Sequence, residues 1–427
     1  MEKLKSIKQE ISSTFCVLPW IHIATRAGGE VTPCCVGEGL GENLNVTNFS
    51  KVWNSKALRG LRKKMLQGKS SSVCKRCYEE EKVNIASHRV RSNKYWKDYY
   101  SFSEFKNKTD KRGYFSSEPI YLDLRLGNKC NLECSMCGPQ ESIRWENSLY
   151  NIDKHVKTLD LKAWIEMKKN SLKKESLFWY EREDIKKDLS SKIPFLKRVT
   201  IAGGEPLLIK EHHWFLEECI KKKQAHHISL HYHTNGTLLD RNLFDKWKYF
   251  ESVMVFISLD ALGDKNYYIR YPCSWSRIEK NLELIDKKSH PNVHPMILCT
   301  LQIKNIFYFE EFINYIMNKK FKKVHAYYED LVHTEVVHHP YFLSCQLLPL
   351  KVKDLVTKKF ENICNTFPSK SNRFKTIVDF MNQQDKSHQL PVFYDYIQSL
   401  DQSRGTDFSK TFPELTRLLN EDKTWLN

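Results

Sequence analysis

The 427-residue sequence has no apolar run that approaches the length of about 20 residues needed to cross a membrane. Its first ten residues place Lys3, Lys5 and Lys8 among single apolar residues, so they also lack the apolar core of a secretory signal. These absences exclude a membrane-spanning or secreted protein. We expect a soluble, cytoplasmic chain that does not bind a membrane.

Acidic residues are the minority among the charged ones. The chain has 51 Asp and Glu against 68 Lys and Arg, which gives a formal net charge of +17. A basic surface attracts an acidic electron donor such as flavodoxin or ferredoxin, and it attracts nucleic acid as well. The lysines are spread along the whole chain without an RNA-binding aromatic motif, so solvated surface charge is the simpler interpretation and nucleic acid is the less favoured partner.

Cysteine, in contrast, is plentiful. A cytosolic protein rarely keeps disulfides, so 13 cysteines, several in paired spacings, indicate metal or cluster ligation. The composition of 41% hydrophobic and 12% aromatic residues supplies enough apolar surface for packed cores. The length predicts two or three domains.

Three of the cysteines lie together on one short segment directly after a strand-like stretch. Cys130, Cys134 and Cys137 are spaced by four and three residues, and no fourth cysteine lies close by. A four-iron cluster takes four ligands, so three local thiolates leave one iron open to another molecule. A zinc loop is the alternative that these residues alone leave open.

This segment resembles the Cys-x3-Cys-x2-Cys motif of the radical S-adenosylmethionine (SAM) superfamily. The resemblance implies that Cys130, Cys134 and Cys137 hold a catalytic 4Fe-4S cluster whose open iron binds SAM. It also implies that an external electron cleaves SAM to methionine and a 5'-deoxyadenosyl radical, which takes a hydrogen atom from a substrate. The chain is therefore expected to be an enzyme.

The middle of the chain alternates short apolar stretches with longer amphipathic ones, which predicts repeated β/α units. Strands are expected at residues 120–126, 198–202, 228–234, 253–259, 296–301 and 324–328. The predicted fold class is α/β, with a partial (β/α)6 radical SAM barrel, a small amino-terminal iron-sulfur twitch domain and a helical carboxyl-terminal tail. The predicted domains are residues 1–115, the twitch-like cluster domain; 116–345, the barrel; and 346–427, a helical extension to which no chemistry is assigned.

Polar and glycine-rich motifs follow the later strands of the predicted barrel, where parallel folds place their chemistry. The segment Gly203, Gly204, Glu205 and Pro206 resembles the superfamily's GGEP motif, which implies contact with the amino group of SAM; alone, such a turn is also an ordinary strand exit. The same resemblance implies that Ser258 contacts the ribose of SAM and that Arg270 pairs with its carboxylate. It adds three further residues to the cofactor-binding set, which are Thr234, Asn235 and Asp260. Ser258 and Asp260 could equally be residues of a strand-end turn.

The amino-terminal cysteines form a second set. Cys16, Cys34, Cys74 and Cys77 resemble the ligands of the twitch domain, a shortened SPASM domain that carries one auxiliary 4Fe-4S cluster. Four thiolates close a site, whether it holds zinc or a cluster. Cys35 is the alternative to Cys34, and a zinc ribbon is the alternative to the cluster. Twitch domains mostly follow the barrel, whereas this one precedes it.

The expected function is a net oxidation of a small molecule by radical SAM chemistry, assisted by the auxiliary cluster. Modification of a peptide or protein side chain by the same chemistry is the first alternative. Modification of tRNA or a nucleotide is another. The alternative from a different class is a zinc- or cluster-stapled nucleic-acid-binding protein. The motifs predict the cofactors in detail and leave the substrate open.

Overall fold

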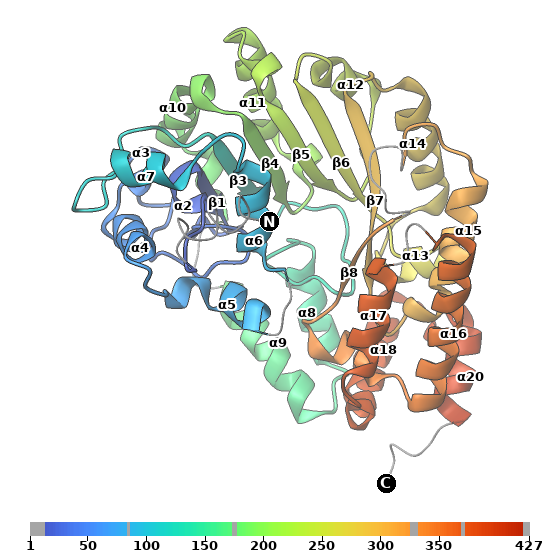
Figure 1. The fold of residues 1–427 in the computed structure, drawn as a ribbon. Coiled ribbons are helices and arrows are strands. Elements are labelled where there is room, and N and C mark those ends of the chain that lie inside the picture. The colour runs from blue at the N-terminus through green and yellow to red at the C-terminus, as the bar shows by residue number, and fades with distance from the viewer. Residues whose placement is uncertain (1–12, 83–85, 173–176, 325–331, 369–371, 422–427) are drawn as a thin grey trace. The chain divides into compact units, whose positions relative to one another are not determined.

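A computed structural model of the chain describes residues 13–82, 86–172, 177–324, 332–368 and 372–421 (Figure 1). No helix among these residues is long and apolar enough to cross a membrane. The predicted α/β class is confirmed, because helices alternate with the strands of a largely parallel sheet. The strand order is β2-β1-β3-β4-β5-β6-β7-β8.

Five of the six predicted strands are present, and each one lies within a few residues of its expected position. The strands are β1 (His22–Thr25), β2 (Val31–Thr32), β3 (Tyr121–Leu126), β4 (Arg198–Gly203), β5 (Ser229–Thr234), β6 (Ser252–Ser258), β7 (Val293–Leu301) and β8 (His333–Val336). The sixth prediction, residues 324–328, falls mostly on residues outside the described part of the chain. The last described strand, β8, lies just beyond them.

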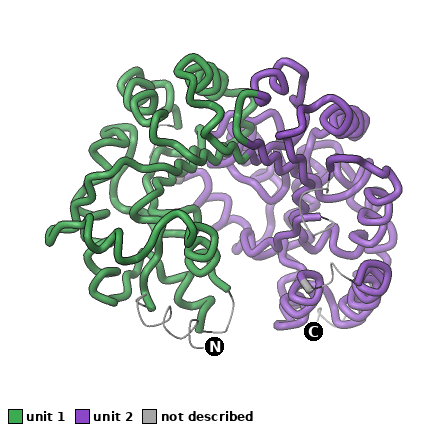
Figure 2. Tube along the Cα trace, turned by 45° about the horizontal axis from the view of Figure 1, so that its top comes forward, with its two compact units in different colours: residues 1–127, 176–231, 249–251 green, residues 128–175, 232–248, 252–427 purple. Residues whose placement is uncertain are grey.

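The chain forms two compact units, coloured separately in Figure 2. Unit 1 comprises residues 1–127, 176–231 and 249–251, and unit 2 comprises residues 128–175, 232–248 and 252–427. These units group the amino-terminal segment with the first strands of the predicted barrel. The division into three domains at residues 115 and 345 stays a prediction.

Unit 1 contains an extension of the sheet that the sequence did not predict. Strand β1 pairs in parallel with β3, and the two-residue β2 pairs antiparallel with β1. Strand β3 pairs in parallel with β4, with Leu122 opposite Val199. The helices of this unit are α2 (Leu18–Ile21), α3 (Phe49–Trp53), α4 (Lys56–Leu66), α5 (Lys75–Lys82), α6 (His88–Trp96), α7 (Phe102–Lys108), α10 (Glu183–Lys192) and α11 (Lys210–Lys221).

Unit 2 contains the parallel pairs of β6 with β7 and of β7 with β8. Its strands are rich in buried Val, Ile, Leu and Met side chains, as expected of parallel strands that are covered on both faces. The helices of this unit are α8 (Trp145–Asp153), α9 (Leu159–Leu172), α12 (Arg241–Trp247), α13 (Gly263–Ile269), α14 (Trp275–Lys288), α15 (Phe309–Asn318), α16 (Leu350–Thr366), α17 (Asn372–Asn382), α18 (Leu390–Arg404), α19 (Phe408–Thr411) and α20 (Pro413–Glu421).

The described part of residues 346–421 is largely helical, as expected. Helix α18 has Pro391 in its first turn and is followed by Gly405, whose φ of 65° is the left-handed conformation that closes many helices. Its buried side chains include Phe393, Tyr396 and Leu400. The extension therefore packs through a continuous apolar face within unit 2.

Candidate functional site

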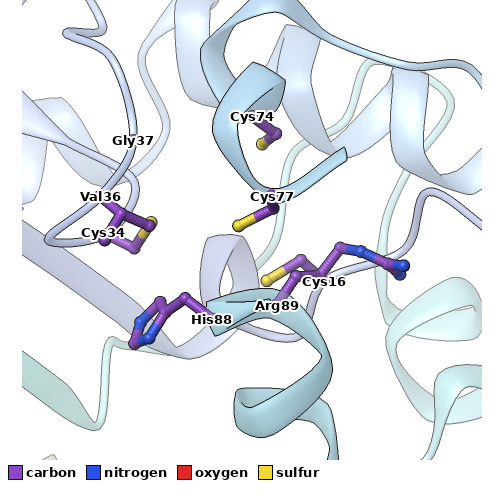
Figure 3. Close-up of a pocket in the computed structure, with 8 residues that line it drawn as sticks. All are labelled: Cys16, Cys34, Val36, Gly37, Cys74, Cys77, His88 and Arg89. Carbon is purple, nitrogen blue, oxygen red and sulfur yellow. The ribbon is translucent and has the colours of Figure 1, made fainter. Parts of the chain in front are cut away.

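Four amino-terminal thiols surround one small cavity in unit 1, and Figure 3 shows their side chains around it. Cys16 precedes α2, Cys34 follows β2, Cys74 ends the short 3-10 helix Ser72–Cys74, and Cys77 lies in the first turn of α5. The cavity is also lined by His88 and Arg89 at the start of α6. The structure therefore brings together the four cysteines that the sequence grouped into one set.

The doublet of Cys34 and Cys35 is divided by the fold. Cys34 is buried and lines the cavity, whereas Cys35 is exposed and does not line it. The Sγ atom of Cys35 lies 3.7 Å from Nε2 of His88. The geometry therefore favours Cys34 as the member of the four-thiol set.

Burial disfavours the ionised form of these thiols when no cation is bound. It raises the pKa of Cys16 to about 12 and that of Cys74 to about 11, and it also raises the pKa of Cys34. The neighbouring thiols of Cys74 and Cys77 raise the pKa of Cys16 further. A positively charged iron core deprotonates such thiols and compensates their charge, so this donor set fits a cluster.

Arg89 is a residue of this site that the sequence did not single out. Its Nη1 donates to the carbonyl of Phe15 at 2.7 Å, and its guanidinium pairs with Glu81. It thus fixes the residue that precedes Cys16 and places a positive charge beside the thiols. No local sequence pattern connects Arg89 with Cys16, because the contact depends on the fold.

The three-cysteine loop lies in unit 2, where polar side chains approach its sulfur atoms. Nδ2 of Asn235 is 4.0 Å from Sγ of Cys130, and Nη1 of Arg270 is 3.9 Å from Sγ of Cys134. N–H groups aimed at thiolate sulfur stabilise an anionic iron-sulfur cluster. The residues present therefore fit the cluster that the motif implies.

Two of these thiols interact directly. A hydrogen bond between Cys134 and Cys137 is the largest cause that lowers the pKa of Cys134, and it raises the pKa of Cys137. The guanidinium of Arg270 lowers the pKa of Cys134 further, against the effect of burial. Of these two effects, only that of Arg270 remains when Cys137 is itself ionised as a ligand.

The turn after β5 contacts the three-cysteine loop through amide and hydroxyl groups. Nδ2 of Asn235 donates to Oδ1 of Asn131 at 2.8 Å, and Nδ2 of Asn131 donates to Oγ1 of Thr237 at 2.9 Å. Thr234 instead accepts from the backbone N–H of Gly236 at 3.1 Å, which closes the turn. Asn131 and Thr237 are therefore positioning residues that the sequence did not reveal.

Asp260 and Arg270 form a buried ion pair, with 2.8 Å between Oδ2 and Nε. The other carboxylate oxygen of Asp260 accepts from the backbone N–H of Thr300 at 2.8 Å. Asp260 therefore orients Arg270, whose terminal Nη1 points to Cys134. Ser258 lies two residues earlier, at the end of β6, and is only partly buried.

The GGEP segment follows β4 in unit 1. Gly203 has a φ of +133°, and a Cβ atom there would lie 2.9 Å from the backbone nitrogen of Leu126. The N–H of Gly204 donates to the carbonyl of Gly127 at 3.0 Å, and Gly127 precedes the three-cysteine loop in the chain. Glu205 is fully buried, and Pro206 starts the 3-10 helix Pro206–Leu208. The position requires glycine because the strand exit packs directly on backbone.

Two family models match the chain. The model of the radical SAM superfamily matches residues 124–316, which include the three-cysteine loop, the GGEP segment and Arg270. The SPASM model, described as an iron-sulfur cluster-binding domain, matches residues 16–78, which include all four cysteines of the amino-terminal cavity.

Curated relatives match part of the chain. Molybdenum cofactor biosynthesis protein 1 of Dictyostelium discoideum is 28% identical over 170 residues, which are 40% of this chain and 22% of that protein. GTP 3',8-cyclase of Aliarcobacter butzleri (strain RM4018) is 26% identical over 185 residues, which are 43% of this chain and 47% of that protein. The match thus spans less than half the length of each relative.

Solved structures resemble the chain weakly. One is native anSMEcpe with bound AdoMet, at 18% identity, a TM-score of 0.37 and coverage of 58% of this chain and 61% of that chain. Another is SuiB of Streptococcus suis bound to precursor peptide SuiA, at 16% identity, a TM-score of 0.28 and coverage of 62% and 50%.

The two family models fall on the two cysteine sets, in the order in which these sets occur along the chain. The SPASM match precedes the radical SAM match, so the auxiliary site is amino-terminal. The predicted cofactor classes are thereby confirmed as a radical SAM iron-sulfur cluster, SAM and an auxiliary iron-sulfur cluster. The chain belongs to the radical SAM superfamily and carries an amino-terminal SPASM iron-sulfur cluster-binding domain.

Proposed function

We propose that this enzyme cleaves SAM reductively at Cys130, Cys134 and Cys137 and carries out a net two-electron oxidation of a small molecule. The auxiliary cluster held by the amino-terminal cysteines would accept the second electron. The observation that carries the proposal is the cavity lined by Cys16, Cys34, Cys74 and Cys77. Four protein ligands leave a cubane no open iron, which suits electron transfer better than substrate binding.

The arrangement of the thiols supports a cluster over zinc at this cavity. Zinc needs its ligand atoms about 2.0–2.3 Å from one point. Within the described part of the chain, no group of three or more His, Cys, Asp or Glu side chains is placed to hold a single metal ion. A four-iron cluster is larger and accepts ligands around a cavity, as these four thiols lie.

The protein's own residues would bind and orient the cofactors. When bound, the clusters and SAM supply the cleaving electron, the 5'-deoxyadenosyl radical and an acceptor for the electron that the substrate loses. Cys130, Cys134 and Cys137 would hold the first cluster. Arg270, oriented by Asp260, would supply positive charge beside it.

The assignments of the remaining SAM contacts are part of the proposal. The backbone of Gly203, Gly204, Glu205 and Pro206 would meet the amino group of SAM, and Ser258 the ribose. Asn235 would hold the loop through Asn131, a role supported by their 2.8 Å hydrogen bond. Thr234 would act through the turn that it closes. Arg270 remains the candidate partner of the SAM carboxylate.

A small molecule is the first candidate substrate because a curated relative, GTP 3',8-cyclase, is named for one. A peptide is the second candidate, because enzymes that join a radical SAM barrel to a SPASM-type domain also modify peptides; SuiB, solved bound to precursor peptide SuiA, binds one. Assays of the purified enzyme with both classes distinguish the two. The electron donor, flavodoxin or ferredoxin, is likewise a proposal.

The first experiment tests the catalytic cluster. Protein reconstituted anaerobically with iron and sulfide should contain about eight irons and form 5'-deoxyadenosine from SAM on reduction. Cys134→Ala should abolish this product, whereas the buried Cys219→Ala on α11 should retain it. Stoichiometric zinc with no 5'-deoxyadenosine in the unmodified protein would overturn the proposal.

The second experiment tests the auxiliary cluster with a matched pair of neighbouring cysteines. Cys34→Ser should lose about four irons and block substrate oxidation while SAM cleavage continues. Cys35→Ser should keep the iron and the activity, because Cys35 does not line the cavity. Full oxidation activity of Cys34→Ser would refute the proposed role as electron acceptor.

A further inference from the structure

The middle of the three-cysteine loop is held by an element that the motifs do not include. The loop carries no helix or strand, so its backbone groups need partners from elsewhere. Three consecutive carbonyls, those of residues 133 to 135, each accept a hydrogen bond from a side chain, and two of the three donors come from α18. The pairs are Arg404 Nη2 to the Glu133 carbonyl at 2.7 Å, Trp145 Nε1 to the Cys134 carbonyl at 3.2 Å and Tyr396 Oη to the Ser135 carbonyl at 2.6 Å.

The N–H groups of the same segment are also paired. Those of Glu133 and Ser135 donate to the carbonyls of Tyr271 and Ile269, at 2.5 and 2.7 Å. The segment is therefore fixed through its N–H groups as well as through its carbonyls. Cys134 lies at its centre, so its position depends on both sets of hydrogen bonds.

Arg404 is held in one orientation. Its side chain is 4% exposed and lies 3.9 Å from Oε2 of Glu133. Its guanidinium carbon lies 4.9 Å from the ring centre of Tyr271 and 5.2 Å from that of Trp145. The planar guanidinium contacts both rings and donates to the carbonyl of the residue before Cys134. It thereby places a permanent positive charge close to Cys134.

Tyr396 is fully buried and is held by the rings of Trp164 and Phe342, at centroid distances of 6.1 and 4.8 Å. The residue whose carbonyl it binds, Ser135, also accepts from the buried Nζ of Lys304 through its hydroxyl. Tyr396 is thus held in place by its own packing. Neither Tyr396 nor Lys304 belongs to a recognised motif, because both lie far from the cysteines in the sequence.

We infer that α18 positions the catalytic cluster. Tyr396 and Arg404 fix the backbone at Cys134, and the charge of Arg404 raises the cluster's reduction potential. This inference rests on the proposed function. Reduction adds one negative charge to a cluster that already carries three thiolates, so a buried cation nearby favours the reduced form. The carboxyl-terminal extension thereby sets how readily SAM is cleaved.

The test is a redox titration of the full-length, reconstituted enzyme followed by electron paramagnetic resonance. Added SAM identifies the catalytic cluster, because it perturbs only a signal from a cluster with an open iron. Arg404→Met removes the charge and keeps the length of the side chain, whereas Arg404→Lys keeps the charge. Tyr396→Phe removes one hydroxyl group.

For Arg404→Met we expect the ratio of reduced to oxidised catalytic cluster at a fixed potential to fall at least about tenfold, which is a shift of 59 mV for one electron. Arg404→Lys should retain most of the ratio. Tyr396→Phe should lose iron from this cluster to a chelator severalfold faster, since the loop loses one fixed carbonyl. The matched controls are Arg417→Met and Tyr394→Phe, which alter less buried positions on α20 and α18.

The outcomes separate the inference from the proposed function. A wild-type signal that SAM does not perturb overturns the proposed function and the inference together. A SAM-perturbed wild-type signal with an unchanged midpoint in Arg404→Met overturns the inference alone. If Arg404→Met holds no cluster, iron loss decides: loss from Tyr396→Phe at the rate of Tyr394→Phe contradicts the inference.

Discussion

Arg62 on α4 organises the core of the amino-terminal segment as a fully buried cation. Its guanidinium lies 4.5 Å from the ring centre of Trp53. Its nitrogens donate to three acceptors, which are the carbonyl of Pro19 at 2.8 Å, the carbonyl of Trp53 at 3.0 Å and Oδ1 of Asn54 at 2.8 Å. Burial lowers its pKa to about 9. One side chain therefore joins α2, α3 and α4.

Replacing this arginine should destabilise unit 1 strongly. Arg62→Met keeps the apolar volume and leaves buried carbonyls without donors, which costs about 3 kcal/mol or more in the free energy of unfolding. Denaturant unfolding of the apo protein measures the loss. Lys64→Met, at an exposed position on the same helix, should change this free energy by less than about 0.5 kcal/mol. Equal effects of the two substitutions would contradict the assigned role.

Two glycines on different elements give opposite predictions for the same substitution. Gly203→Ala forces a Cβ to 2.9 Å from the backbone nitrogen of Leu126 at a φ of +133°, so unit 1 should lose more than about 1 kcal/mol of stability. Gly60→Ala, on α4, meets nothing within 4 Å and should add about 0.5–1 kcal/mol. Thermal unfolding measures both effects. A neutral Gly203→Ala would show that the strand exit tolerates displacement.

At the scale of elements, a capping contact ties α18 to the start of α9. Oδ2 of Asp395 accepts from the backbone N–H groups of Lys157 and Thr158, at 2.9 and 2.7 Å, and from the Thr158 hydroxyl at 2.8 Å. Helix α9 begins at Leu159, so these two amides belong to the residues that directly precede its first turn. The carboxylate thereby joins two helices that are distant in sequence.

Removing this contact should loosen unit 2. Asp395→Ala removes the hydrogen bonds of a buried carboxylate to Lys157 and Thr158 and should lower the free energy of unfolding by about 1–3 kcal/mol. Asp395→Asn keeps an acceptor oxygen and should lose less. Asp379→Ala, at an exposed position on α17, is the control and should change little. Denaturant unfolding distinguishes the three variants, and equal values for Asp395→Ala and Asp379→Ala would refute the contribution of the cap.

The elements that the sequence predicted share a strong local pattern. Short apolar stretches predicted β3 to β7, and residues 346–427 were predicted to be helical, where α16 to α20 lie. Strand β1 was missed, because His22–Thr25 has few apolar residues and depends on pairing with β3. The apolar residues of 51–66 recur at roughly helical spacing throughout, yet the stretch is divided into α3 and α4. The side chain of Ser55 accepts from the backbone N–H of Leu58 and starts the second helix.

The candidate site, like the fold, was predictable from the sequence only where a local pattern marks it. Cysteine spacing is a local signal, so the sequence alone groups the thiols into two sets, and the four amino-terminal members line one cavity. The polar and charged stretch at residues 94–113 has no comparable local signal, and it contains the end of α6 and all of α7. Arg89, Tyr396 and Arg404 could not be found, because each reaches its cysteine segment only through the fold. From hydropathy alone, an arginine such as Arg62 is expected on the surface. Its burial is explained by the three acceptors that the fold places around its guanidinium.

At the scale of the whole molecule, the net charge of +17 predicts a salt-dependent association with the proposed electron donor. An acidic flavodoxin is attracted to a basic surface, and salt screens this attraction over about 10 Å at 0.1 M. The rate of flavodoxin-driven SAM cleavage should therefore fall severalfold between about 0.05 and 0.5 M NaCl, a range over which the screening length shortens markedly. The donor concentration is kept below saturation. Stopped assays of 5'-deoxyadenosine formation measure this rate.

Reduced methyl viologen provides the matched control because it is a small cation. The basic surface repels it, so salt should leave its rate unchanged or increase it. A parallel fall with both donors would indicate that salt acts on the enzyme itself, on SAM binding or on the cluster. A flavodoxin rate that does not change with salt would contradict electrostatic docking, and the excess of lysine would then be solvated surface charge without a role in electron delivery.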